Sequence, residues 1–290
     1  VRQPPQWHLQ ARDAHNGRAL WQRPVASWWP HLALWTSGPR QLQRRLLAVG
    51  DRVYATLGYH APLSALDAAT GETVRVYAET AGAEEAIWHD GVLLVVVRGV
   101  TAERGSELEA WSDLAAQPDS PLRLRETMDP FLKRLRGVET AAPVSLLAIE
   151  ADTGRVLWRK DGAEAVGISP PSLAADGGRV FLQKGNEVRC LDLKSGDPLW
   201  TAAAARLRLV CERAVVCVDK ETATALAPAT GRPIWSEGLL LSDVRDAFVI
   251  GDRLWLGGFK PFDTGKRHTG PAWGPDRKST RLNSSHRIRS

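Results

Sequence analysis

The segment LDLKSGDPLW, Leu191 to Trp200, decides the fold class because it holds the residues of a β-hairpin in a fixed order. Asp192 can accept hydrogen bonds from backbone NH groups within a turn. Gly196, four residues later, can adopt the positive φ angle that closes such a loop. Pro198 cannot donate to a sheet ladder, so the strand that contains it is predicted at a sheet edge. The segment therefore predicts a strand, a tight turn and an edge strand.

Four further segments share this pattern. They are RDAHNGRALW (12–21), LDAATGETVR (66–75), IEADTGRVLW (149–158) and LAPATGRPIW (226–235). In every copy Asn, Ser or Thr precedes the glycine, and in four of the five copies Trp follows that glycine by four residues. The second copy departs from the pattern, with Arg75 in the Trp position. Self-similarity of this kind is the main sign of a repeat architecture.

A further strand is predicted before each hairpin, in residues 52–56, 92–97, 179–182 and 214–218. Two of these stretches, VLLVVV and AVVCV, are apolar throughout instead of alternating. Strands of that composition are usually covered on both faces. A sheet packed between two neighbouring sheets meets that condition, and the repeat Trp side chains then fill the space between sheets. The prediction is an all-β fold, a β-propeller of four-stranded antiparallel blades.

The spacing of the repeat glycines sets the number of blades. The glycines at 17, 71, 154, 196 and 231 lie 54, 83, 42 and 35 residues apart. The last two spacings suit a four-stranded blade of roughly 40 to 50 residues. The gap of 83 residues requires an insertion or a hidden degenerate copy of the repeat. We favour an insertion at about 98–143, in which short helices are expected. A sixth blade begins near Phe248, so about six blade segments are predicted in an incomplete ring.

The segment from Asp276 to Ser290 is set apart from the rest of the chain. Residues 276–286, DRKSTRLNSSH, resemble the translation of a short-read sequencing adapter. We therefore expect propeller sequence in residues 1–275, as part of a longer protein, and an artefactual, disordered tail in residues 276–290. That tail carries four of the five net positive charges. Without it the charge is close to neutral, which removes the basic footprint typical of nucleic-acid binding.

The sequence offers few candidates for chemistry. Cys190, Cys211 and Cys217 are scattered, and Cys211 and Cys217 are predicted on one strand, roughly 20 Å apart. We interpret them as buried structural thiols. The seven histidines show no paired spacing, so no metal site is predicted. The cluster Trp28, Trp29 and Trp35 could line a ligand or partner surface or pack within the first connection.

Acidic residues of the repeat are the remaining candidates. Asp67, Glu150 and Asp192 could be catalytic, but each occupies the turn position of its repeat, so a structural role is favoured. The glycines of residues 176–179 could suggest a phosphate loop. No helix is predicted after them to present its N-terminus, and a hairpin turn is favoured instead. No catalytic residue is predicted, and cofactor-binding residues are left unassigned.

The repeated hairpin resembles the PQQ-like repeat of quinoprotein and BamB-type β-propellers. LDAATGETV and LDLKSGDPLW are similar to that family's Leu-Asp-x-x-Thr/Ser-Gly-x-x-x-Trp pattern, and the resemblance recurs over nearly all of residues 10–260. The family contains enzymes and non-enzymes, and a shared fold does not decide between them. Its dehydrogenases hold their cofactor with adjacent cysteines, calcium and a catalytic Asp, whereas this chain has no Cys-Cys pair.

Two functions follow from the resemblance. The first is a non-catalytic propeller that serves as a binding or protein-interaction platform, with protein partners, no cofactor and no nucleic acid. The alternative is a quinone (PQQ)-dependent dehydrogenase whose active site lies outside this part of the protein. No apolar stretch approaches the roughly 20 residues of a membrane helix, so no transmembrane segment is predicted. The residues leave the compartment open, and the resemblance implies a periplasmic or other extracytoplasmic location.

The repeat tryptophans give a testable prediction. Trp158, Trp200 and Trp235 should take equivalent places in successive blades and be mostly buried. Replacing Trp200 with Ala should lower the free energy of unfolding by about 3 to 5 kcal/mol, the usual range for a large core aromatic side chain. The same change at Trp111, in the proposed insertion, should cost less. Urea melts of the two variants check this, and equal, small losses would contradict it.

Overall fold

The computed structural model describes residues 7–26, 44–99, 142–204, 206–219, 222–239, 242–251, 253–259 and 281–287. These residues form two compact units. The first unit comprises residues 1–171 together with Lys194–Gly196, and the second comprises the rest. The described residues are almost all in strands, with three short 3-10 helices, Ala78–Thr80, Gly162–Glu164 and Pro170–Ser172. No helix in the described ranges is long and apolar enough to cross a membrane.

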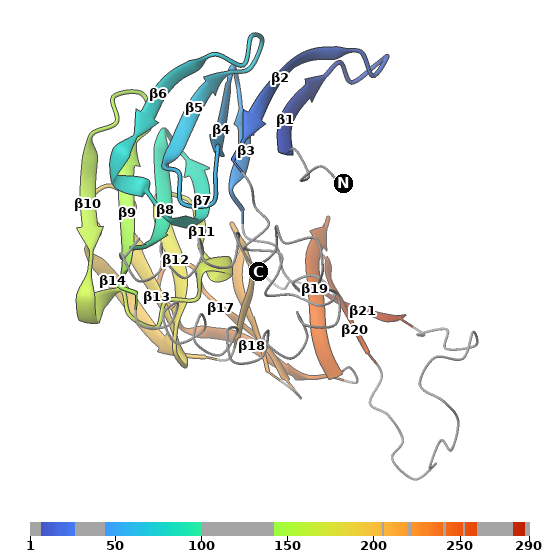
Figure 1. The fold of residues 1–290 in the computed structure, drawn as a ribbon. Coiled ribbons are helices and arrows are strands. Elements are labelled where there is room, and N and C mark those ends of the chain that lie inside the picture. The colour runs from blue at the N-terminus through green and yellow to red at the C-terminus, as the bar shows by residue number, and fades with distance from the viewer. Residues whose placement is uncertain are drawn as a thin grey trace, which may run out of the picture. The chain divides into compact units, whose positions relative to one another are not determined.

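The first unit contains three antiparallel sheets (Figure 1). One is the hairpin β1 (Trp7–Arg12) and β2 (Ala19–Val25). The second, in the order β3-β4-β5-β6, comprises β3 (Leu46–Val49), β4 (Arg52–Thr56), β5 (Leu63–Asp67) and β6 (Thr73–Tyr77). The third, in the order β7-β8-β9-β10, comprises β7 (Ala83–His89), β8 (Val92–Arg98), β9 (Val144–Glu150) and β10 (Val156–Lys160).

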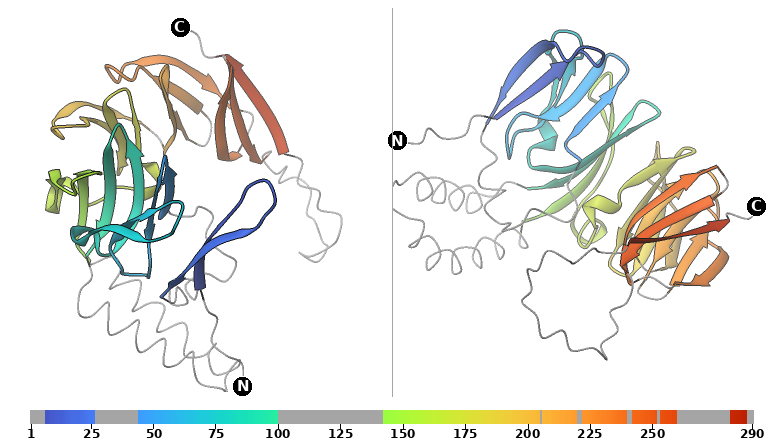
Figure 2. Two further views of the ribbon diagram at one scale, coloured as in Figure 1. Left: turned by 90° about the horizontal axis from the view of Figure 1, so that it is seen from above. Right: turned by 90° about the vertical axis from the view of Figure 1, so that its right-hand side faces the viewer.

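The second unit also contains three antiparallel sheets (Figure 2). The first comprises β11 (Ala174–Asp176), β12 (Arg179–Lys184), β13 (Glu187–Asp192) and β14 (Pro198–Ala203). The next comprises β15 (Arg206–Cys211), β16 (Ala214–Val218), β17 (Thr222–Leu226) and β18 (Pro233–Gly238). The last comprises β19 (Ser242–Ile250), β20 (Arg253–Phe259) and β21 (Arg281–Arg287). The described residues thus form six sheets, four of them with four strands paired in chain order, as predicted.

Each repeat glycine closes the turn between the last two strands of its sheet, or between β1 and β2. The glycines at 17, 71, 154, 196 and 231 have φ angles between 69° and 79°. In the second repeat the Gly71 NH donates to the Asp67 carbonyl at 2.8 Å, and the Asp67 NH donates to the Glu72 carbonyl at 2.8 Å. The fifth repeat keeps both bonds although Ala227 replaces the acid. The backbone therefore defines the turn, and the acidic side chain adds to it.

The repeat tryptophan of one sheet covers the repeat glycine of the next. A Cβ atom built on Gly71 would lie 2.6 Å from the Trp21 ring, and one built on Gly231 would lie 2.5 Å from the Trp200 ring. Trp158 covers Gly196 in the same way. Two of the indoles also donate to the carbonyl three residues before the glycine, Trp21 to Ala68 at 2.8 Å and Trp200 to Pro228 at 2.9 Å.

The tryptophan positions are equivalent, as predicted, but their burial differs. Trp158 is buried, with 8% of its surface exposed, whereas Trp200 and Trp235 are half-buried. Outer strands lie at the rim of their sheet, so a ring there is covered mainly by the turn of the neighbouring sheet. In the second repeat Arg75 takes the Trp position, and its Cδ atom lies 3.2 Å from a Cβ built on Gly154. The long arginine side chain thus replaces the indole over the glycine.

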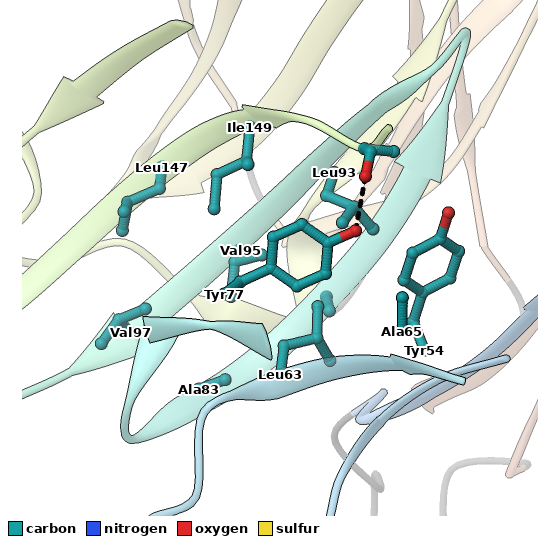
Figure 3. Close-up of a cluster of buried hydrophobic side chains, with 12 residues drawn as sticks. Tyr54, Leu63, Ala65, Tyr77, Ala83, Leu93, Val95, Val97, Leu147 and Ile149 are labelled. Atoms are coloured by element: carbon teal, nitrogen blue, oxygen red, sulfur yellow. Dashed lines mark hydrogen bonds between the residues drawn. The ribbon is translucent and has the colours of Figure 1, made fainter. Parts of the chain in front are cut away.

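The core of the first unit lies between the two four-stranded sheets (Figure 3). The central strand β8 is buried along its whole apolar run, with Val92 to Val96 fully inaccessible, which confirms that strands of this composition are covered on both faces. Tyr54 and Tyr77 lie in this cluster, and the Tyr77 hydroxyl donates to the Ala151 carbonyl at 2.6 Å. Burial raises the pKa of Tyr77 to about 12. The hydroxyl is therefore a neutral donor that links β6 to the turn after β9.

The spacing of 83 residues between Gly71 and Gly154 is spanned by one sheet. Strand β8 ends at Arg98 and pairs directly with β9, which begins at Val144, so residues 99–143 connect two neighbouring strands. Residues 100–141, which include Trp111 and the predicted helices, lie outside the described residues. The cluster Trp28, Trp29 and Trp35 also lies outside them. The interpretation of residues 98–143 as an insertion stays a prediction.

The structure differs from the expected disordered tail at Arg281–Arg287. These residues form β21, which pairs with β20 from Arg253↔Arg287 to Phe259↔Arg281. Strand β20 would otherwise present an unpaired row of backbone groups, and any chain able to extend can satisfy such a row. The adapter-like origin of the segment stays a prediction, because pairing through the backbone carries no information on where a sequence came from.

The tryptophan–glycine contact predicts the effect of adding one methyl group. Gly231→Ala should lower the free energy of unfolding by about 2 to 5 kcal/mol, since the left-handed backbone costs about 1 to 2 kcal/mol and overpacking against Trp200 about 1 to 3 kcal/mol. Gly185→Ala is the matched control, because Gly185 has a φ of 57° and an added Cβ would meet nothing within 4 Å. Urea melts should show a clearly smaller loss for the control, and equal losses would contradict the role of the ring.

The second repeat provides the reverse experiment. Arg75→Trp should place an indole over Gly154 and raise the free energy of unfolding by about 1 kcal/mol, because more apolar surface leaves water. Arg75→Ala should uncover the glycine and lower it. The comparison needs only urea midpoints of the three proteins. A loss of stability in Arg75→Trp would show that this turn does not accept the ring.

Candidate functional site

The acidic side chains of the first three repeats accept hydrogen bonds within their turns. The Asp67 carboxylate accepts from the Ala69 and Thr70 backbone NH groups, each at 2.9 Å, and Asp13 accepts from the same two positions of its own turn. The hydrogen bond from the Thr70 backbone NH is the main reason that the pKa of Asp67 lies below its ordinary value. The hydrogen bond from Thr153 does the same for the pKa of Glu150. These carboxylates are held ionised in the turns, which agrees with the structural role favoured from the sequence.

The cysteines are placed differently from the prediction. Cys211 ends β15 and Cys217 lies in β16, so the two are on adjacent antiparallel strands and not on one strand. The reason is a two-residue turn at Glu212 and Arg213, which the apolar residues around it did not reveal. In the register Cys211 faces Ala214, while Cys217 faces Leu207. All three cysteines are free thiols, and burial raises the pKa of Cys190 and of Cys217 to about 12.

No group of three or more His, Cys, Asp or Glu side chains in the described ranges is arranged to hold a metal ion. Residues 176–179 form the β11–β12 turn, with Gly177 and Gly178 at positive φ. That is the hairpin turn favoured from the sequence.

A buried glutamate links neighbouring sheets of the first unit. Glu85 is buried in β7 and accepts hydrogen bonds from the Arg44 backbone NH, at 3.0 Å, and from the Arg44 guanidinium. The Ala86 NH in turn donates to the Arg44 carbonyl at 2.8 Å. Burial raises the pKa of Glu85 above its ordinary value, while Arg44 opposes that shift. These contacts fix the backbone at the start of β3, where the next residue is Arg45.

Arg45 is a buried cation at the wall of a pocket in the first unit. Its side chain is 7% exposed, its Nη1 atom donates to the Tyr59 carbonyl at 3.1 Å, and its guanidinium carbon lies 5.4 Å from the centre of the Tyr59 ring. The Thr56 NH donates to the Arg45 carbonyl at 3.3 Å, so the ends of β3 and β4 lie side by side.

The pocket lies between the β1–β2 hairpin and the adjoining ends of β3 and β4. Its volume is about 270 Å³. Apolar side chains form most of the wall, from Leu9 and Val25 on the hairpin and from Leu46 and Ala55 on the sheet. The polar side chains are Trp7, His8, Arg45 and Thr56. Sequence analysis did not find this site, because its residues belong to no motif and come from four strands.

A second candidate surface is the outer edge of β6. This strand ends its sheet, and its only neighbour in that sheet is β5. Val74 and Val76 are half-exposed, at 50% and 52%. The outer strands β14 and β18 begin with Pro198 and Pro233, whereas β6 contains no proline. Proline is a common protection of an edge strand, so β6 is less protected than β14 and β18.

Comparison with known proteins identifies the family. A family model described as outer membrane protein assembly factor BamB matches residues 5–118 and 136–254, which is most of the chain. The chain belongs to this family. That result, together with the four-stranded antiparallel sheets, confirms the PQQ-like β-propeller class inferred from the repeat. No curated protein matches the chain in sequence.

Solved structures give more distant similarities. BamB from Moraxella catarrhalis is 16% identical, with 74% of this chain and 60% of that chain covered and a TM-score of 0.45. The computationally designed Ika8 protein is 12% identical, with 86% and 61% covered and a TM-score of 0.51. The chain therefore spans about 60% of the length of each, and the second resembles it in fold.

Proposed function

We propose that this BamB-family chain is a non-catalytic platform for protein partners, and that the outer edge of β6 is a strand to which a partner adds. The observation that carries the proposal is the exposure of Val74 and Val76 on a proline-free edge strand. An edge strand presents an unpaired row of NH and CO groups, which is a template for another strand. The family's description as an assembly factor for outer membrane proteins supports a protein as the partner.

Strand addition suits the chemistry of this edge. Backbone hydrogen bonds to the added strand would give affinity, and contacts with alternate side chains would give specificity. Val74 and Val76 lie two residues apart, so they project from the same face of β6 and offer a small apolar strip to a partner. Arg75 projects from the opposite face, where it covers Gly154. The partner segment that fits is extended, with apolar residues at alternate positions.

Site-specific cross-linking tests the proposal. A photoreactive amino acid at position 76, in full-length protein expressed in its own host, should form an adduct with one defined protein. Val74→Lys in the same protein should abolish the adduct, since a charge on an edge strand opposes pairing. Position 199 in β14 is the matched control, because Leu199 is 48% exposed at the repeat position equivalent to Val74. No adduct at position 76, or the same adducts at both positions, would contradict the proposal.

The quinone-dependent dehydrogenase stays the alternative hypothesis. Adding PQQ to the purified protein and measuring dye-linked alcohol oxidation separates the two functions, because a platform protein should show neither cofactor absorbance nor turnover.

A further inference from the structure

The pocket beside the β1–β2 hairpin contains polar atoms that the fold leaves without hydrogen bonds. The Thr56 side chain is only 4% exposed, and its hydroxyl has no hydrogen-bond partner among the described residues. The Trp7 indole NH is likewise buried and has no partner among them. Both side chains line the pocket. A buried donor without a partner costs stability, so its retention at the wall of a cavity points to a ligand that supplies the missing bond.

The polar groups of the pocket wall are mainly donors. The Trp7 indole and the Arg45 guanidinium can only donate, and the Thr56 hydroxyl can donate or accept. Arg45 also brings a positive charge, and only 7% of the surface of this residue is exposed. Among the described residues that line the pocket there is no Asp or Glu. This wall therefore selects for an acceptor, and a charged acceptor gains most from a guanidinium in a low-dielectric site.

The rest of the wall selects for hydrocarbon. Leu9, Val25 and Ala55 line it, and so does Leu46, which is 56% exposed although it is a large apolar side chain. The volume of about 270 Å³ exceeds the 150 Å³ or so that holds a benzene molecule and lies just below the usual range of ligand pockets. The space therefore suits about ten non-hydrogen atoms, which excludes large polycyclic cofactors.

We propose that this pocket binds a small apolar monocarboxylate, with its hydrocarbon chain against Leu9, Val25, Leu46 and Ala55 and its carboxylate at Trp7, Arg45 and Thr56. Such a ligand would satisfy the Thr56 hydroxyl and the Trp7 indole NH. Both atoms are buried in the structure, so binding requires a small movement of these side chains. It would also place a negative charge beside the buried guanidinium. This site is separate from the β6 edge, so the proposal does not depend on the proposed function.

Octanoate is the probe, and 1-octanol is its neutral counterpart of similar length. In a proton–nitrogen correlation spectrum of the full chain, octanoate should shift the Trp7 indole cross-peak, which is assigned by its absence in Trp7→Phe. Titration should saturate in the micromolar to millimolar range. Octanol should bind at least tenfold more weakly, because it offers no charge to Arg45.

Thr56→Val separates a binding role from a structural role. It removes a hydroxyl that has no partner in the described fold, so the melting temperature should stay the same or rise. Affinity for octanoate should fall about ten- to a hundredfold, the usual effect of one lost hydrogen bond to a charged group. Thr224→Val is the control, because that hydroxyl lies 3.1 Å from the Ser236 hydroxyl in the second unit. The control should leave octanoate binding unchanged.

Three results would overturn the proposal. The first is an unshifted Trp7 cross-peak with saturating octanoate. The second is equal affinity for octanoate and octanol, which would show a pocket for hydrocarbon alone. The third is a Thr56→Val protein with a melting temperature several degrees lower and an unchanged affinity for octanoate. That result would show that the hydroxyl stabilises the fold and does not bind the ligand.

Discussion

The stacking of an indole ring on a glycine is the interaction on which the rest of the structure depends. It needs three things at once: a turn that closes with a positive φ, no side chain at that residue, and a large flat ring four residues beyond the preceding glycine. Trp21, Trp158 and Trp200 provide the ring over Gly71, Gly196 and Gly231. The contact thus ties the local hairpin signal in the sequence to the packing of one sheet on the next. The buried apolar strands between the turns then supply most of the stability.

The same contact explains why the fold class could be predicted from the sequence. Ten residues specify the turn, the strand after it and the packing between sheets. Because the pattern recurs along the chain, it can be recognised in the sequence. Gly154 follows the pattern even though Arg75 takes the Trp position, because a long aliphatic stem can cover a glycine as well. The β15–β16 turn shows the limit of local reasoning. Glu212 and Arg213 form a turn with neither Gly nor Pro, so Cys211 and Cys217 were placed on one strand when they lie on two.

The candidate sites were beyond sequence reasoning for a different reason. The pocket brings together Trp7 from β1, Arg45 from the residue before β3 and Thr56 from β4, and none of these residues occupies a position of the repeat hairpin. Its defining property is a hydroxyl and an indole NH left without hydrogen bonds, which only coordinates can reveal. The edge of β6 could not be predicted either, since the sequence does not distinguish Val74 from a buried strand residue and only the structure shows its exposure. Repeats identify a scaffold well because they are regular, whereas function resides in departures from that regularity.

The indole–glycine contact also has a direction. A repeat of this kind presents a ring on one side and a bare glycine on the other, so neighbours meet head to tail, as Trp21, Trp158 and Trp200 do over Gly71, Gly196 and Gly231. A heterologous contact of this kind does not itself determine how many repeats join. A gene segment that encodes one repeat could therefore be duplicated or lost, and the new neighbours would still fit. The blade number of such a protein is then set by how the ring closes, and families built on this junction can change size during evolution without inventing a new interface.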